Sequence, residues 1–465
     1  MKIKFLGAAK NVTGSRHLIE HNEARLLIDC GLYQEREFRA RNWEKFPVIP
    51  ASIDCVVLTH AHIDHCGYLP KLVKDGFKGK IYCTYPTAEI AEIGLLDAAH
   101  LQESDAEFKR KRHRKEGRKG HYPEVPLYSV EDAKRVPRLF KKAHYKEKFT
   151  ITESITGTFY DAGHILGAAM VELRFTEGKD VKTAVFSGDI GRWDKPILCD
   201  PHTFDQAGYV VMESTYGNRS HGDQGTCSED FSKIINETNK AGGNIIIPTF
   251  ATERAQELLY CLSRLLKDNK IPHLMTFLDS PMAIDVTKVF QKYPDYFDEN
   301  AKALIKKGDD LFDFPLLKTT KSAPESKAIN HVKGTAVIMA GSGMCTGGRI
   351  KHHLLRNLSR PESTVIFVGY QAKGTLGREI LEGASKVRVF GQNVSVRARI
   401  EKINGFSAHA DREELLRWIN GFKHAPKKIF VIHGEDVVAE EFGETLKHKL
   451  TSEVIVGEYL KEYLL

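Results

Sequence analysis

The sequence predicts an α/β protein in which one domain is inserted into another. Three features indicate this: short apolar runs between polar loops up to residue 208, alternating strand and helix patterns from residue 209, and short strand patterns again from about residue 391. Unbroken apolar runs are typical of strands buried on both faces, and strand–helix alternation favours a parallel sheet. We therefore expect a first domain formed by residues 1–208 and 391–465, with residues 209–390 as the insertion.

The composition is that of a folded globular enzyme, with 42% hydrophobic and 28% charged residues among 465. It excludes a disordered chain and a collagen. No apolar run is long enough to span a membrane, and the first six residues alternate like a strand rather than a signal peptide. The eight cysteines are scattered without a C-x-x-C pair, which favours reduced thiols. We expect a cytoplasmic protein that has no membrane association.

Individual elements follow from the apolar pattern. A long helix is expected from about Thr87 into a basic segment, Lys109–Lys119. Two further helices are expected from about Ser228 to Gly242 and over 255–266. Strands are expected at 26–28, 55–58, 184–186, 209–212, 244–247, 273–278, 336–339, 365–368, 396–403 and 429–432.

The strongest functional signal is the segment His60-Ala61-His62-Ile63-Asp64-His65, directly after the expected strand 55–58. Three imidazoles and a carboxylate this close together suit a borderline-soft, redox-inert cation such as Zn²⁺. Compatible side chains follow other apolar strands, at the edge where α/β folds collect ligands. Together they supply enough nitrogen and oxygen donors for two metal ions: Asp29, His164, Asp189 and His433.

These motifs resemble the metallo-β-lactamase superfamily and, within it, the β-CASP nucleases of RNA processing. The lactamase-type motifs are Asp29, the segment 60–65, His164 and Asp189. The β-CASP-type motifs are Glu213 within 213–221, His409 within 406–411, and His433, with further matches at 280–283, 341–349 and 374–377. The resemblance covers essentially the whole chain. It implies a metallo-β-lactamase αββα sandwich that carries an inserted α/β β-CASP domain.

The resemblance also implies a site with two Zn²⁺ ions per chain. It assigns His60, His62 and His164 to one ion and Asp64, His65 and His433 to the other, with Asp189 bridging both. Asp29 is expected to orient the segment 60–65, although a plain turn residue is the alternative.

The chemistry that the resemblance implies is hydrolysis of single-stranded RNA by a hydroxide shared between the two ions, with Asp64 and Asp189 holding the ions. His409 is expected to give a proton to the departing ribose oxygen, kept cationic by Glu213. A structural ion pair between His409 and Glu213 is the alternative. The residues expected to contact phosphates are Ser342, Gly343, Arg349 and Ser407.

Other functions stay open at this point. A DNA nuclease is one, although DNA-processing relatives typically carry valine where His433 stands. A small-molecule metallo-hydrolase would need neither the insertion nor the Glu213/His409 pair, and a catalytically inactive scaffold subunit would have lost metal ligands. The choice between endonuclease and 5′-to-3′ exonuclease, and a homodimer, are also open.

The resemblance does not explain two parts of the chain. The basic segment Lys109–Lys119 carries eight Lys or Arg and one Glu, which accounts for the whole formal charge of +7. It either contacts the RNA backbone or is a solvated helix end. In Ala251–Arg254 the chain has Glu253 where relatives often carry glycine. We expect neither the N-terminal KH-like extension of many archaeal relatives nor the extra C-terminal domain of the RNase J type.

Overall fold

The computed structural model describes residues 1–118, 124–220, 227–403 and 405–465. The chain forms two compact units. The first unit contains 1–195, 199–220 and 409–465, and the second contains 196–198 and the described part of 221–408. An α/β unit is therefore inserted into another, as the sequence predicts.

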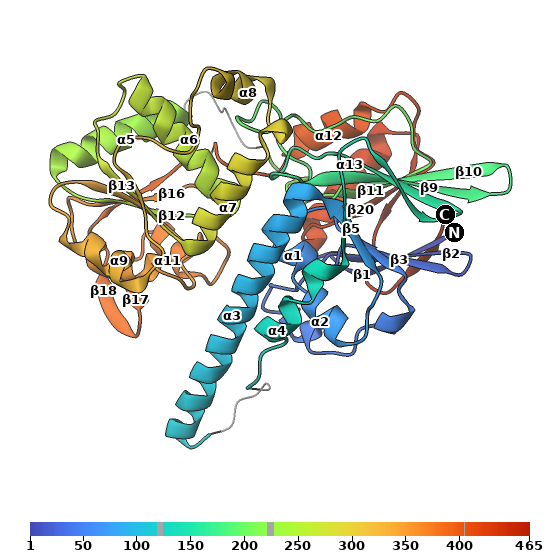
Figure 1. Cartoon of the computed structure of the whole chain (residues 1–465), viewed down its shortest axis with the longest axis horizontal. Helices are drawn as coiled ribbons and strands as arrows, with labels where there is room; N and C mark the ends of the chain where they lie inside the picture. The colour runs from blue at the N-terminus through green and yellow to red at the C-terminus, as the bar shows by residue number, and fades with distance from the viewer. Residues whose placement is uncertain (119–123, 221–226, 404) are drawn as a thin grey trace. The chain divides into compact units, whose positions relative to one another are not determined.

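Two seven-stranded sheets form the first unit (Figure 1). The first sheet has the order β22 (Glu462–Leu464), β1 (Lys2–Gly7), β2 (Arg16–His21), β3 (Ala24–Ile28), β4 (Cys55–Val57), β5 (Lys80–Thr84), β6 (Phe140–Ala143). The second has the order β21 (Glu453–Val456), β20 (Lys428–Ile432), β11 (Tyr209–Glu213), β10 (Asp180–Phe186), β9 (Ala169–Glu177), β8 (Ile155–Asp161), β7 (Lys148–Thr152).

The two sheets pack face to face, with helices outside them. Phe5 of the first sheet contacts Phe430 of the second, with ring centroids 5.6 Å apart, inside a core that both sheets share. Trp418 and Phe442 attach α12 (Arg412–Asn420) and α13 (Asp436–Lys449) to the other face of the second sheet. The helices beside the first sheet are α1 (Ile63–Cys66), α2 (Leu69–Lys74), α3 (Tyr85–Glu116) and α4 (Val130–Ala133). These layers are those of the predicted αββα sandwich.

The second unit contains a six-stranded parallel sheet. Its order is β14 (Leu317–Thr319), β13 (Met275–Asp279), β15 (Ala336–Ala340), β12 (Ile245–Pro248), β16 (Thr364–Phe367), β19 (Arg399–Lys402). A hairpin joins β17 (Lys386–Val389) to β18 (Gln392–Ser395). The helices are α5 (Cys227–Ala241), α6 (Arg254–Lys267), α7 (Pro281–Lys292), α8 (Glu299–Lys306), α9 (Ala323–Ala328), α10 (Ile350–Asn357) and α11 (Leu376–Leu381).

Short 3-10 helices occur in both units. They are η1 (Arg39–Asn42), η2 (Pro50–Ser52), η3 (Val136–Leu139), η4 (Pro294–Tyr296) and η5 (Ile329–His331). Among the described residues, no helix is both long enough and apolar enough to cross a bilayer.

The unit boundaries differ from the predicted domain boundaries of 208/209 and 390/391. Strand β11, expected to begin the insertion, lies in the first unit because it pairs in parallel with β10 and β20. Strand β19, expected in the returning tail, lies in the second unit because it pairs with β16. The insertion therefore covers the described part of 221–408. A short apolar run predicts a strand, but it does not tell which sheet the strand joins.

The core between the sheets gives a stability prediction. Phe175 of β9 is fully buried there, and we expect Phe175→Ala to lower the free energy of unfolding of the first unit by about 3–5 kcal/mol. Urea denaturation in a chelator, followed by tryptophan fluorescence, measures this unit alone because Trp43, Trp193 and Trp418 all lie in it. The control is Val181→Ala on neighbouring β10, where the side chain is exposed and the expected change is within about 0.5 kcal/mol. Equal losses in both variants would contradict this core.

Candidate metal centre

The candidate site lies in the first unit, at the carboxyl ends of parallel strands. Asp29 and the segment 60–65 follow the parallel neighbours β3 and β4. Asp189 follows β10, Glu213 ends β11 and His433 follows β20, and these three strands are also parallel neighbours. The carboxyl ends of the parallel strands of both sheets lie at the same edge of the sandwich. Segments far apart in the sequence therefore bring their side chains to one place. His164 reaches the same place from the connection between β8 and β9.

The loop after β3 is packed tightly against the loop after β4. The amide of Cys30 donates to the carbonyl oxygen of His65 at 2.7 Å. At Gly31 a Cβ atom would lie 1.5 Å from the carbonyl oxygen of Asp64, so only glycine fits there. Asp29 adopts a left-handed backbone conformation with φ +58°. This backbone packing fixes Asp29 beneath the segment 60–65.

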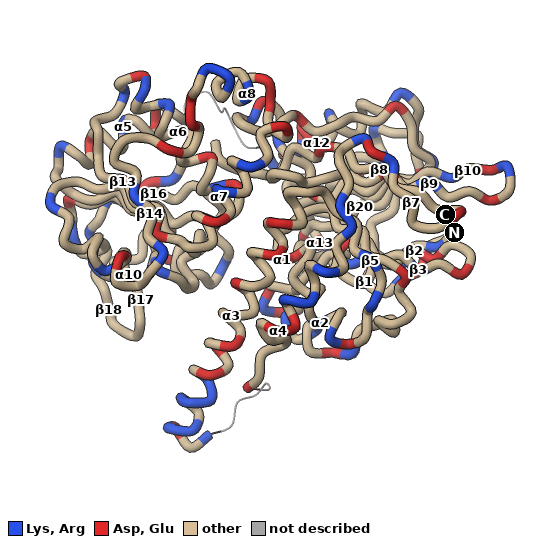
Figure 2. Tube along the Cα trace, in the orientation of Figure 1, with Lys and Arg blue, Asp and Glu red and all other residues tan. Residues whose placement is uncertain are grey.

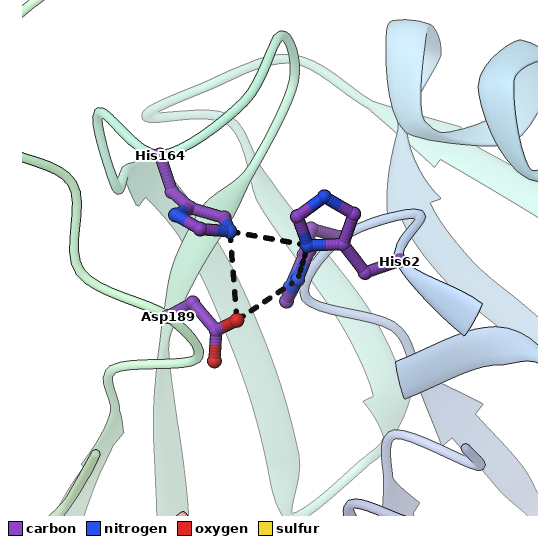
Figure 3. A group of neighbouring side chains, drawn as sticks. His62, His164 and Asp189 are labelled. Carbon is purple, nitrogen blue, oxygen red and sulfur yellow. Dashed lines mark hydrogen bonds and ion pairs between the residues drawn. The ribbon is translucent and has the colours of Figure 1, made fainter. Parts of the chain in front are cut away.

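Three imidazole nitrogens and one carboxylate oxygen form a first group (Figure 3). His62 Nδ1 lies 3.1 Å from both His60 Nε2 and His164 Nε2. Asp189 Oδ2 lies 3.3 Å from His60 Nε2 and 3.5 Å from His164 Nε2. Ligands placed 2.0–2.1 Å from a tetrahedral zinc ion lie about 3.3 Å from one another. The four atoms therefore have the spacing of one zinc ligand set.

A second group forms around the other oxygen of Asp189. His65 Nε2 lies 3.0 Å from His433 Nε2, and Asp189 Oδ1 lies 3.2 Å from the former and 3.6 Å from the latter. Asp64 Oδ2 lies 3.6 Å from His433 Nε2. Asp189 thus presents one oxygen to each group, which is the arrangement of a carboxylate that bridges two cations.

Contacts behind the imidazoles determine which nitrogens face the site. Asp29 Oδ2 accepts from His65 Nδ1 at 2.7 Å and from the Thr59 hydroxyl at 2.8 Å. Thr59 Oγ1 in turn lies 3.0 Å from His60 Nδ1 and accepts its proton. Thr215 has the same role at His433, because its hydroxyl donates to the His433 carbonyl and accepts from His433 Nδ1 at 3.1 Å. The Nε2 lone pairs of all three histidines are therefore directed into the site.

The donor set fits divalent cations. Both oxygens of Asp189 are buried, and no described residue donates a hydrogen bond to them. These oxygens accept no hydrogen bond from the described part of the chain and face the converging nitrogen lone pairs. The oxygens and the lone pairs repel each other unless positive charge lies between them. Histidine and aspartate are ligands typical of zinc sites.

The pKa values agree with this chemistry. Burial lowers the pKa of His60 to about 3 and that of His62 to about 4, so both rings are neutral and can offer a lone pair to a metal ion. At His65 and His433 burial also lowers the pKa, but neighbouring carboxylates outweigh it and the net shift is upward: Asp189 and Asp29 at His65, and Asp189 and Asp64 at His433. The second group thus attracts positive charge.

His409 and Glu213 stand beside the first group. His409 Nδ1 lies 3.2 Å from Glu213 Oε1 and 3.9 Å from Asp189 Oδ2, and its ring centroid is 4.5 Å from that of His164. Glu213 is fully buried and also accepts from the amide of Ile190 at 2.6 Å. Burial lowers the pKa of His409, but Glu213 and Asp189 together raise it to about 9. The imidazole is therefore predisposed to carry a proton next to the candidate metal centre.

The predicted phosphate contacts lie in the second unit. Ser342 and Gly343 follow β15, where the Ser342 hydroxyl accepts from the amide of Gly347. Arg349 forms an ion pair with buried Asp279 at 2.7 Å and donates to the carbonyls of Thr320 and Lys321. Ser407 is half-buried, close to the end of this unit. Their role at phosphates stays a prediction, and Arg349 has a structural partner that the sequence does not reveal.

The backbone at Glu253 explains why relatives often carry glycine at this position. Glu253 has φ +66°, a conformation that favours the glycine often found there in relatives. Arg254 is buried, pairs with Glu257 at 3.0 Å and stacks over Phe406.

The sequence analysis missed Thr59 and Thr215. Both are threonines within the metal-site motifs, one directly before His60 and one two residues after Glu213. Their position beside predicted ligands was the available signal.

Three family models match the chain. They are the metallo-beta-lactamase superfamily domain over residues 18–186, the Beta-Casp domain over 255–380 and the Zn-dependent metallo-hydrolase RNA specificity domain over 393–456.

Curated relatives match over nearly the whole chain. A ribonuclease of Thermus thermophilus is 37% identical and covers 96% of this chain and 96% of its own length. An RNase J-like protein of Methanocaldococcus jannaschii is 31% identical, with 96% of this chain and 95% of the relative covered. The transcription termination factor FttA of the same organism is 30% identical over 98% of this chain and 70% of its own length.

Among solved structures, a protein of unknown function from Enterococcus faecalis superposes with a TM-score of 0.53 at 12% identity. The superposition covers 100% of this chain and 99% of that one. It shows a likeness of fold alone.

The contacts of Asp29 give a prediction about metal affinity. Both oxygens of Asp29 accept hydrogen bonds, one from the Thr59 amide and the other from the Thr59 hydroxyl and His65 Nδ1. In Asp29→Asn the NH₂ group meets a donor in either orientation, and we expect zinc affinity to fall about 10- to 100-fold. Competition with a chromogenic chelator measures it. The control is Asp54→Asn. The Asp54 carboxylate accepts a hydrogen bond from the amide of Arg25 at the opposite end of β3. Unchanged affinity in Asp29→Asn would refute the orienting role.

Proposed function

Because this chain belongs to the β-CASP ribonuclease family of the metallo-β-lactamase superfamily, we propose that it hydrolyses phosphodiester bonds of single-stranded RNA with two zinc ions as cofactors. The family assignment makes it a metal-dependent ribonuclease. The observation that carries the finer proposal is the pair of donor groups that share Asp189. The zinc-dependent RNA specificity domain supports both the metal and the substrate.

The metal ligands would be divided between two ions. His60, His62 and His164 would hold one ion with Asp189 Oδ2, and Asp64, His65 and His433 would hold the other with Asp189 Oδ1. A bound pair of divalent cations activates water and stabilises negative charge on the phosphate oxygens. The chain's own contribution is to fix the ligands and to exclude bulk water from Asp189.

His409 donates the proton to the departing ribose oxygen. Its side chain is 21% exposed while that of Glu213 is fully buried, so a substrate can meet the imidazole but not the carboxylate. Since Nδ1 faces Glu213, Nε2 is the atom that delivers the proton. Bound cations lower the pKa of a neighbouring imidazole, and Glu213 opposes that effect. Glu213 thereby keeps His409 protonated and oriented.

The contacts of His433 favour RNA over DNA as the substrate. At the position where DNA-processing relatives typically carry valine, His433 supplies a nitrogen to the second donor group. We also propose a cytoplasmic location, because Cys30, Cys55, Cys66, Cys83 and Cys345 are buried thiols. A homodimer stays a prediction that size-exclusion chromatography can test.

The proton-donor role predicts a specific kinetic loss. We expect His409→Ala to lower kcat on RNA about 10²- to 10⁴-fold, because the departing oxygen then lacks its proton. Zinc content should stay at the wild-type value, because His409 lies outside both donor groups. His424→Ala, an exposed histidine of the same unit, is the control and should keep full activity. Full activity of His409→Ala at saturating zinc and substrate would rule out the donor role.

The substrate is tested in the same assay. Wild type should cleave an unstructured RNA and leave the DNA of the same sequence intact, whereas equal cleavage would favour the DNA nuclease. RNAs with a 5′-phosphate, a 5′-hydroxyl or a circular form determine the mode, because only an endonuclease opens a circle.

A further inference from the structure

The outer part of helix α3 does not contribute to the core of the first unit. Helix α3 runs from Tyr85 to Glu116, and its last buried residue is Ala106. From Glu107 to Arg118 every residue is exposed except half-buried His113. Figure 1 shows this part extending beyond the rest of its unit. We call residues 107–118 the α3 tip; Lys119, the last residue of the basic segment, lies outside the described residues.

The α3 tip is strongly basic. It contains seven Lys or Arg and two Glu, and Figure 2 shows the basic residues gathered at the free end of the helix. The ion pairs of Glu107 with Lys111 and of Glu116 with Arg112 and Arg118 neutralise part of this charge. The remaining bases are Lys109, Arg110, Arg114 and Lys115.

This charge is unfavourable for the helix by itself. Arg110 and Arg114 are four residues apart, as are Lys111 and Lys115, and like charges at this spacing destabilise a helix. Exposed helices of this length are also only marginally stable without packing. A polyanion bound along the tip would relieve the repulsion. A second copy of the chain would not, because its tip carries the same charge.

An exposed aromatic side chain lies among these bases. Phe108 is 66% exposed. Lys115 follows it at i+7 on the same helix face, beyond the ion-paired Lys111 and Arg112. Lys109 and Arg114 are the chain neighbours of Phe108 and Lys115. An aromatic ring surrounded by cationic side chains is the combination that binds single-stranded nucleic acid. The ring stacks on a base while the cations pair with phosphates.

We propose that the α3 tip is a second binding site for single-stranded RNA, outside the metal centre. Phosphates pair with Lys109, Arg114 and Lys115, and a base stacks on Phe108. This inference rests on the proposed function, because it extends the RNA contact of the same enzyme. The tip would hold the part of a long RNA that the metal centre does not contact.

The geometry of α3 sets the length of RNA needed. The helix begins next to the metal centre, because the hydroxyls of Thr84 and Thr87 both donate to the carbonyl of Gly167 in the connection that carries His164. Phe108 lies 23 residues after Tyr85, which is about 35 Å along the helix axis. A stacked strand advances about 3.4 Å per nucleotide, so roughly ten nucleotides span this distance. Shorter RNAs cannot contact both places.

The test variant is Lys109→Gln/Arg114→Gln/Lys115→Gln, which keeps the ion-paired residues. Its matched control is Lys80→Gln/Lys179→Gln/Lys427→Gln, which removes three exposed charges from the same unit. Lys80 begins β5, which is parallel to β4, Lys179 lies in the β9–β10 hairpin, and Lys427 precedes β20. All three are therefore at the strand ends opposite the metal centre. Phe108→Ala tests stacking, with exposed Val181→Ala as its control.

The measurement is the Kd of an unstructured 30-nucleotide phosphorothioate RNA by fluorescence anisotropy with zinc-loaded protein, because this RNA keeps its backbone charge and resists cleavage. We expect the triple tip variant to raise the Kd about tenfold and to reduce the slope of log Kd against log salt by about 2. Phe108→Ala should raise the Kd about fivefold or more. The control variants should bind like wild type, and kcat on a six-nucleotide RNA should be unchanged in all of them.

Two results would overturn this inference. One is a Kd for the triple tip variant or for Phe108→Ala equal to that of its control. The other is equal binding of a 30-base-pair RNA duplex, because paired bases cannot stack on Phe108. The proposed function fails separately, if wild type loaded with zinc does not cleave the six-nucleotide RNA.

Discussion

The first unit has to hold together side chains that repel one another around Asp189. Five imidazole nitrogens and both Asp189 oxygens converge in a buried volume. Neighbouring atoms of this set lie 3.0–3.6 Å apart. Lone pairs and negative oxygens at such distances, away from water, repel one another. Positive charge between them stabilises the arrangement, and every converging side chain is of a type that binds divalent cations.

The fold meets this constraint with rigid elements. Parallel strands of two different sheets end at the same edge, and the loops after them are locked by backbone contacts such as the one at Gly31. Behind the ligands, Asp29, Thr59 and Thr215 fix which imidazole nitrogen points inward. All residues of the candidate metal centre, together with the His409/Glu213 pair, therefore lie in the first unit. The second unit contributes a parallel sheet with its own buried polar network around Asp279.

The sequence predicted the fold because its signals are local. Apolar runs such as 55–58 predict strands from neighbouring residues alone, and the family models confirm a metallo-β-lactamase domain with an inserted Beta-Casp domain. What the sequence did not show depends on contacts between distant segments. Nothing near β11 or β19 tells which sheet each strand joins, and the Asp279 partner of Arg349 is 70 residues away. Thr59 and Thr215 stand in motifs beside predicted ligands, but their hydrogen bonds to His60 and His433 appear only in three dimensions. The assignment of each ligand to its ion stays a prediction.

The most direct test of this account is an anomalous difference map from crystals grown with zinc and recorded at the zinc absorption edge. The account predicts two peaks, one beside Asp189 Oδ2 within the His60, His62 and His164 group, and one beside Asp189 Oδ1 within the Asp64, His65 and His433 group. A single peak, or density bound by other residues, would contradict the claim that Asp189 joins two cation sites.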